Sequence, residues 1–114
     1  MADFVILLVE DDWFQREVMA DILRDEGFKV IELDTAEAAE LILSSPGTEV
    51  QALITDHNLP GTMSGAALAE FARRRRPHMT IIVISGTRVE AIPANTKFLQ
   101  KPFAPERLLE AIRR

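Results

Sequence analysis

The chain has no cysteine, no long apolar run and no excess of basic residues, and each absence counts against a kind of site or a kind of partner. Without cysteine, neither a disulfide nor a thiolate metal site is possible, which fits a cytoplasmic protein. No stretch approaches the roughly 20 apolar residues of a membrane span, and MADFVILL lacks the basic flank and cleavage site of a signal peptide. The net charge of −5 disfavours nucleic acid as the main partner.

Apolar runs alternate with helical patterns along the 114 residues, a length typical of one domain, and we expect residues 1–114 to form it. Strands are predicted at 4–9, 29–33, 50–55, 79–84 and 98–100, and helices at 13–26, about 36–44, about 64–76 and from Pro105 onward. Such alternation predicts a doubly wound α/β fold, in which a five-stranded parallel sheet carries helices on both faces.

Acidic residues follow two of the predicted strands. The buried run FVILLV leads directly into Glu10 and Asp11, and the third strand ends at Asp56. If the strand order is 2-1-3-4-5, strands one and three are neighbours, so these carboxylates converge at one edge of the sheet. Carboxylates that converge repel one another unless a cation lies between them, and Mg²⁺ prefers oxygen ligands. The alternative is a set of solvated loop acids.

A hydroxyl and a cation follow two further strands at the same edge. Ser85 ends strand four in IIVISG, and Lys101 ends strand five in FLQKPF. Lys101 and a bound metal ion would neutralise a phosphoryl group, while the Ser85 hydroxyl would donate a hydrogen bond to it. Asp56 could then act as the nucleophile, because carboxylates form acyl phosphates.

Four segments, LLVEDD, ALITDHNLPGTMSG, IIVISG and FLQKPF, occur in order and each follows a strand. With them the chain resembles the receiver domain of bacterial two-component response regulators, a flavodoxin-like fold, over essentially its whole length. The resemblance implies that Asp56 accepts a phosphoryl group from a phosphohistidine on a sensor histidine kinase or histidine phosphotransferase. It also implies a Mg²⁺ site made of Asp11, Asp56, the backbone carbonyl of Asn58 and, through water, Glu10.

The same resemblance implies a conformational switch and a downstream effector protein as a possible partner. Ser85 matches the family's conserved hydroxyl residue, Lys101 its invariant lysine, and Phe98 its switch aromatic. The peptide bond between Lys101 and Pro102 is typically cis in the family. On phosphorylation Ser85 would move toward Asp56, and Phe98 would turn into the space that Ser85 vacates.

Two segments depart from the family pattern. Only 15 residues separate Ser85 from Lys101, about five fewer than usual, and Pro93 interrupts them. We therefore expect the fourth helix of the family to be short, distorted or missing. The loop after Pro60 is one residue longer than usual, so the letters GTM should bulge near the site, where they could either touch a partner or hinder phosphate access.

Other functions receive less support. A phosphatase of the haloacid dehalogenase type needs a second Asp where the chain has Asn58, and a flavodoxin-like electron carrier needs a phosphate loop where the chain has acids. The stronger rival is a receiver fold that docks partners without phosphorylation.

The run Arg73–Arg76 is interpreted as a solvated helix end, which complements the helix dipole. We expect a signalling domain, not an enzyme, without nucleic-acid or membrane contacts of its own.

Overall fold

The computed structural model describes residues 3–113, and within them five strands alternate with helices along most of the chain. The strands are β1 (Val5–Val9), β2 (Lys29–Leu33), β3 (Ala52–Asp56), β4 (Thr80–Ser85) and β5 (Lys97–Gln100). The helices are α1 (Trp13–Asp25), α2 (Ala36–Ser44), α3 (Gly65–Arg75) and α4 (Pro105–Arg113). All neighbouring strands pair in parallel in the order β2-β1-β3-β4-β5, which confirms the predicted fold.

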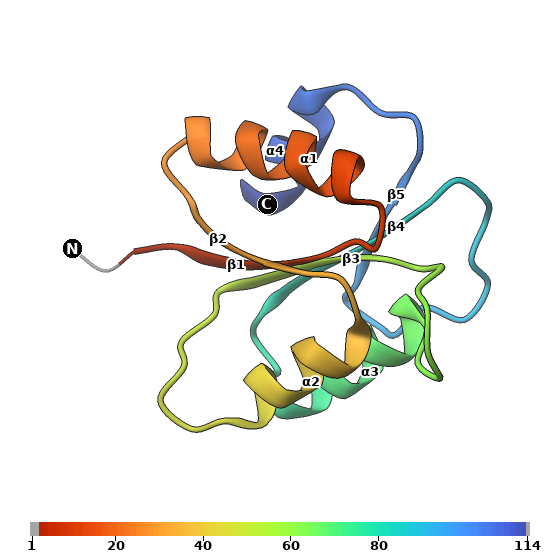
Figure 1. Ribbon diagram of the computed structural model, residues 1–114. Helices are drawn as coiled ribbons and strands as arrows, with labels where there is room; N and C mark the ends of the chain where they lie inside the picture. Colours follow the sequence, from red (N-terminus) through yellow and green to blue (C-terminus); the bar gives the residue numbers. More distant parts are fainter. Residues whose placement is uncertain (1–2, 114) are drawn as a thin grey trace.

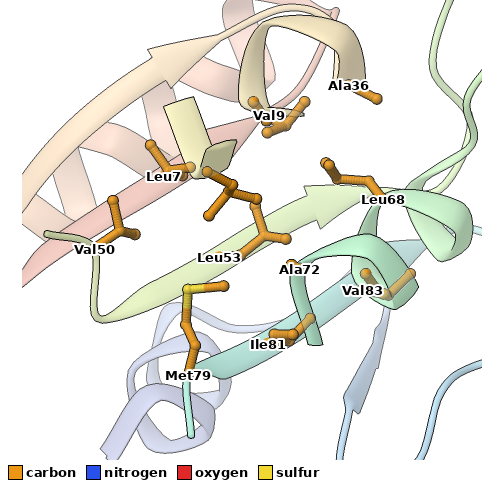
Figure 2. Packing of buried hydrophobic residues seen from close by; sticks show 13 residues of the cluster. Leu7, Val9, Ala36, Val50, Leu53, Leu68, Ala72, Met79, Ile81 and Val83 are labelled. Atoms are coloured by element: carbon orange, nitrogen blue, oxygen red, sulfur yellow. The ribbon is translucent and has the colours of Figure 1, made fainter. Parts of the chain in front are cut away.

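The sheet lies between two layers of helices, with α1 and α4 on one face and α2 and α3 on the other (Figure 1). Side chains alternate between the two faces of each strand, so β1, β2, β3 and β4 each contribute to two separate cores. Figure 2 shows the core between the sheet and helices α2 and α3, to which Leu53 of β3 and Leu68 of α3 both belong. Because both faces are covered, the three central strands β1, β3 and β4 are almost wholly apolar, and polar side chains collect where they end.

Capping residues set the helix boundaries. The side chains of Asp12, Thr35 and Ser64 each accept a hydrogen bond from a backbone N–H in the first turn of the helix that follows. Gly27 follows α1 with a φ of 92°, the left-handed conformation that glycine adopts at little cost. The strand bounds shift slightly, since β3 and β4 each extend one residue further than predicted and thereby include Asp56 and Ser85.

Helix α1 leaves part of its apolar surface exposed. Its buried residues are Met19, Ala20 and Leu23, which pack against the sheet. Phe14 and Val18 lie on the outside, with 63% and 43% of their surfaces exposed. Helix α1 therefore has two apolar surfaces. One packs in the core, and the other faces outward beside the carboxyl ends of the strands.

The connection between β4 and β5 contains no helix, as expected from its length. Residues 86–96 run as an irregular loop (Figure 1). The guanidinium of Arg73 in α3 holds this loop, donating hydrogen bonds to the carbonyls of Met79 at 2.7 Å and of Asn95 at 2.7 Å. Arg76 likewise donates to the carbonyls of Leu43 at 3.4 Å and Thr48 at 3.2 Å. The interpretation of the arginine run as merely solvated is thus wrong for these two residues.

Candidate functional site

Three carboxylates meet at the carboxyl ends of β1 and β3. The register pairs Val9 with Thr55, so Glu10 and Asp11 follow β1 beside Asp56, the last residue of β3. Glu10 and Asp56 are 2% and 7% exposed, whereas Asp11 is exposed. Each of the three offers a carboxylate oxygen, and these oxygens lie within 4.8 Å of one another. The cluster could hold a hard metal ion, since its donors are all oxygens and one of its residues faces outward.

Lys101 neutralises part of this negative charge. Its ammonium Nζ lies 2.8 Å from Asp56 Oδ1 and 3.0 Å from Glu10 Oε1. A third hydrogen bond of 2.6 Å runs from Nζ to Gln15 Oε1 in the first turn of α1. Sequence reasoning identified Lys101 but missed Gln15, because no spacing rule links a residue in α1 to one at the end of β5. The structure thus places Lys101, Glu10, Asp11 and Asp56 together as the sequence predicts.

The pKa values of two groups in the cluster depart from their ordinary values. Burial raises the pKa of the Glu10 carboxyl above 4.5, and the negative charge of Asp56 adds to the rise, although the hydrogen bond from Lys101 opposes both. Burial alone would lower the pKa of the Lys101 ammonium, but its hydrogen bonds to Asp56 and Glu10 outweigh that effect and raise it. Lys101 therefore stays charged wherever these acids are ionised.

Ser85 lies at the end of β4 next to the acidic cluster. Its neighbour Ile84 pairs with Asp56 across the sheet, and the Ser85 carbonyl accepts a hydrogen bond of 2.9 Å from the Lys101 backbone N–H. The Ser85 side chain is fully buried, and its hydroxyl oxygen accepts from the Thr87 N–H at 3.2 Å. In this structure the Ser85 hydroxyl is bonded toward Thr87, a residue that sequence reasoning did not single out.

Two other residues expected at the site lie near its rim. Phe98 of β5 is 36% exposed, so its ring is turned at least partly outward. Asn58, whose backbone carbonyl was expected to bind metal, lies exposed in the loop that follows β3. The peptide bond between Lys101 and Pro102 is cis, as expected.

The backbone of Asp56 is in close contact with the start of α3. The Gly65 N–H donates a hydrogen bond of 2.9 Å to the His57 carbonyl, and Gly65 packs directly against this part of the chain. A Cβ atom on Gly65 would lie 2.1 Å from the Asp56 carbonyl oxygen and 2.7 Å from His57 Cα. Because both neighbours are backbone atoms, only glycine fits here without displacing the residue that carries the candidate nucleophile.

We therefore predict that Gly65→Ala lowers the free energy of unfolding by about 2 to 3 kcal/mol, the cost of forcing an atom into a packed site. Gly86→Ala is the matched control, since a Cβ atom on Gly86 would meet nothing within 4 Å. Denaturant unfolding of the two variants tests this contact. Equal stability of Gly65→Ala and Gly86→Ala would show that the close approach at Asp56 is not tight.

The extended loop after Pro60 is fastened to α2. The Glu37 carboxylate accepts hydrogen bonds of 3.2 Å from both the N–H and the hydroxyl of Thr62. A hydrogen bond from Glu37's own backbone N–H lowers the pKa of this carboxyl, and those from Thr62 lower it further. Gly61 has a φ of 92°, and a Cβ atom there would lie 3.0 Å from the Glu37 oxygens. The bulge predicted from the sequence is thus held against the first turn of α2.

Together these features define a doubly wound α/β domain with an acidic, lysine-bridged site at the carboxyl edge of its sheet. The family model of the response regulator receiver domain matches residues 6–113. The chain belongs to this family, whose members serve two-component signalling.

Similar proteins agree with this assignment. The response regulator protein FleR of Pseudomonas aeruginosa is 34% identical over 96% of this chain and 24% of its own length. The sensor kinase CckA of Brucella abortus is 31% identical over 95% of this chain and 12% of its own. The chain thus spans about a quarter of the first curated relatives that it matches.

Solved structures give the same result. A response regulator receiver protein from Sinorhizobium medicae superposes with a TM-score of 0.92 at 27% identity, covering 97% of this chain and 92% of that one. The receiver domain of the hybrid histidine kinase CckA superposes with a TM-score of 0.82 at 31% identity, covering 96% and 95%. Among the helices of residues 3–113, none has both the length and the apolar character needed to cross a membrane.

Proposed function

We propose that Asp56 is the phosphoacceptor of a two-component phosphorelay and takes its phosphoryl group from a phosphohistidine on a sensor histidine kinase or histidine phosphotransferase. The observation that carries this proposal is the 2.8 Å contact between Lys101 Nζ and Asp56 Oδ1 inside a cluster of three acids. An ammonium at this position stabilises the charge of a phosphoryl group that arrives at the Asp56 carboxylate.

The transfer itself exchanges one bond for another. A carboxylate oxygen of Asp56 attacks the phosphorus of the donor phosphohistidine, and a phosphorus–oxygen bond forms as the phosphorus–nitrogen bond breaks. The imidazole nitrogen keeps the electron pair of the broken bond, and the ring leaves as a neutral imidazole whose other nitrogen carries the proton. Lys101 contacts a phosphoryl oxygen throughout, and the Ser85 hydroxyl turns from Thr87 to donate a hydrogen bond to another.

The acids are suited to hold Mg²⁺ beside the acceptor. Glu10, Asp11 and Asp56 supply carboxylate oxygens within 4.8 Å of one another, and we propose the Asn58 backbone carbonyl as a further ligand. When bound, Mg²⁺ would offset the repulsion between these acids and the incoming phosphoryl group. Lys101 and Ser85 would orient the phosphoryl group, and Lys101 would balance part of its charge.

Phosphorylation would then act as a switch. When Ser85 turns toward the phosphoryl group, the partly exposed ring of Phe98 can move into the space near β4, as the resemblance implies. Phe98 has no hydroxyl, so packing alone holds the inward position. The surface around β5 changes shape, and we propose that a downstream effector recognises this change.

The exposed surface of α1 is the proposed contact for the phosphodonor protein. Phe14, Val18 and Ile22 line a groove of about 620 Å³ together with Lys101 and Gln15. Because this groove and the acidic site share Lys101, a protein that brings a phosphohistidine to Asp56 must cover it. An apolar helical surface on that protein matches the apolar residues exposed here.

Replacing Phe14 and Val18 together with alanine should slow phosphotransfer from a protein phosphohistidine by about tenfold, since exposed aromatic anchors dominate such interfaces. Phosphorylation by acetyl phosphate, which needs no protein contact, should be unchanged. The control is Leu41→Ala, because Leu41 is 71% exposed on α2, across the sheet. If the double variant lost the same rate with the protein donor and with acetyl phosphate, the defect would lie in the phosphorylation site and not in the groove.

The proposal is tested by incubating the protein with acetyl phosphate and Mg²⁺, followed by intact-mass measurement. We expect an adduct of about 80 Da that forms with Mg²⁺ and not with a chelator present. A docking module that works without phosphorylation would show no adduct under conditions that modify other receivers, and that result would favour the rival function.

We further propose that residues 1–114 form one receiver domain, of which residues 1–2 and 114 lie outside the described residues. On this proposal the domain is a signalling element of the cytoplasm, where sensor kinases deliver phosphoryl groups. We propose that it is a signalling phosphoacceptor with at most self-phosphotransfer and autodephosphorylation, and that it does not itself bind nucleic acid or membranes.

A further inference from the structure

Among the partners that residues 3–113 offer the Lys101 ammonium, the side chain of Gln15 is the neutral one. An ammonium has three N–H groups, and those of Lys101 lie opposite Asp56, Glu10 and Gln15 at 2.8, 3.0 and 2.6 Å. Two of these acceptors are acids that also belong to the candidate metal cluster. Gln15 is the only acceptor of the three whose role does not overlap with metal binding.

The backbone holds Gln15 in place through a closed ring of hydrogen bonds. The Glu10 carboxylate accepts from the Asp12 N–H at 3.2 Å, and the Asp12 carboxylate in turn accepts from the Gln15 N–H at 3.0 Å. The Gln15 side chain then returns to Lys101, which bonds back to Glu10. The N-cap of α1 therefore fixes the backbone from which the Gln15 side chain reaches Lys101.

From this ring we infer that Gln15 is a positioning residue for Lys101, holding its ammonium beside Asp56 while the acids bind metal. The inference rests on the proposed function and deepens it. If Glu10 turned to a bound metal ion, Lys101 would lose that charged partner, and Gln15 would keep the ammonium at the site.

Two substitutions separate this role from simple packing. Gln15→Met keeps an unbranched side chain of similar length but removes the amide oxygen. Gln15→Glu restores an acceptor oxygen at the same reach. We expect Gln15→Met to lower the maximal rate of acetyl phosphate labelling about tenfold, the lower end of what one hydrogen bond to a charged group contributes, and Gln15→Glu to retain most of the rate. The Mg²⁺ concentration for half-maximal labelling should change by less than about twofold.

A second measurement needs neither metal nor phosphate. In Mg²⁺-free protein, the NMR order parameter of the Lys101 side-chain nitrogen should fall in Gln15→Met and be retained in Gln15→Glu. Gln100→Met is the matched control, since the Gln100 amide points to the Gly86 carbonyl at 3.5 Å instead of to Lys101. It should leave both measurements unchanged.

Two results would overturn the inference. One is a Lys101 order parameter that stays the same in Gln15→Met. The other is a labelling rate that Gln15→Glu fails to restore. If wild-type protein takes no label at all, the proposed function is lost, and the order parameter alone decides whether Gln15 positions Lys101.

Discussion

Replacing Asp56 with asparagine should abolish the phosphoryl adduct completely while leaving the protein folded. An amide oxygen is a poor nucleophile and cannot form a stable acyl phosphate, so the chemistry is lost at its first step. The folded state should survive, because Lys101 keeps its contacts with Glu10 and Gln15. Intact-mass measurement after acetyl phosphate treatment, together with thermal unfolding, checks both parts.

The matched control is Asp12→Asn, which changes a neighbouring acid in the same way. Asp12 caps α1 by accepting hydrogen bonds from the N–H groups of Phe14 and Gln15, a role that asparagine also performs. This variant should therefore still take the adduct. If Asp56→Asn gained the same mass as wild type, another residue would be the acceptor.

Replacing Lys101 with methionine should have the second largest effect, on both chemistry and stability. Loss of the ammonium removes the contact that stabilises the transferring phosphoryl group, and labelling by acetyl phosphate should slow about 100-fold. The same change leaves Glu10 and Asp56, which are 2% and 7% exposed, without their cation. Since the Lys101 side chain is 25% exposed, we expect a loss of about 2 kcal/mol at neutral pH, less than for a fully buried pair.

The stability loss in Lys101→Met should depend on pH in a defined direction. Burial and the charge of Asp56 raise the pKa of Glu10, and removing Lys101 takes away the contact that opposes them. A carboxyl whose pKa is higher in the folded state destabilises the fold once the pH exceeds its unfolded value of 4.5. The deficit should be full at neutral pH and shrink as the pH falls through the raised pKa.

Denaturant unfolding at several pH values measures this dependence, and a parallel series with Mg²⁺ tests the cluster as a metal site. Mg²⁺ should restore much of the lost stability of Lys101→Met, because it supplies positive charge to the same acids. A deficit that neither acid nor Mg²⁺ reduces would mean that Lys101 stabilises the fold by packing alone.

The residues at the strand ends could be predicted from the sequence because a parallel sheet fixes where they meet. Glu10, Asp56, Ser85 and Lys101 each follow or end a strand, so the topology alone brings them to one edge. Each of these predictions combines a local sequence pattern with one rule about the whole fold, which is that parallel strands end at the same edge of the sheet.

The contacts that the sequence did not predict join elements whose relative placement is fixed by no general rule. Gln15 to Lys101 and Glu37 to Thr62 are side-chain contacts between segments 86 and 25 residues apart. The helical pattern predicted α1, but it did not predict that Phe14 would be exposed. A sequence pattern does not tell whether another element covers an apolar side chain.

The central claim is that Asp56, among the three clustered acids, is the residue that receives the phosphoryl group. Borohydride reduces an aspartyl phosphate to homoserine, so treating labelled protein with borohydride and sequencing its peptides by mass spectrometry locates the acceptor. The account predicts homoserine at position 56, formed only when Mg²⁺ was present. Reduction at Glu10 or Asp11, or equal labelling without Mg²⁺, would contradict it.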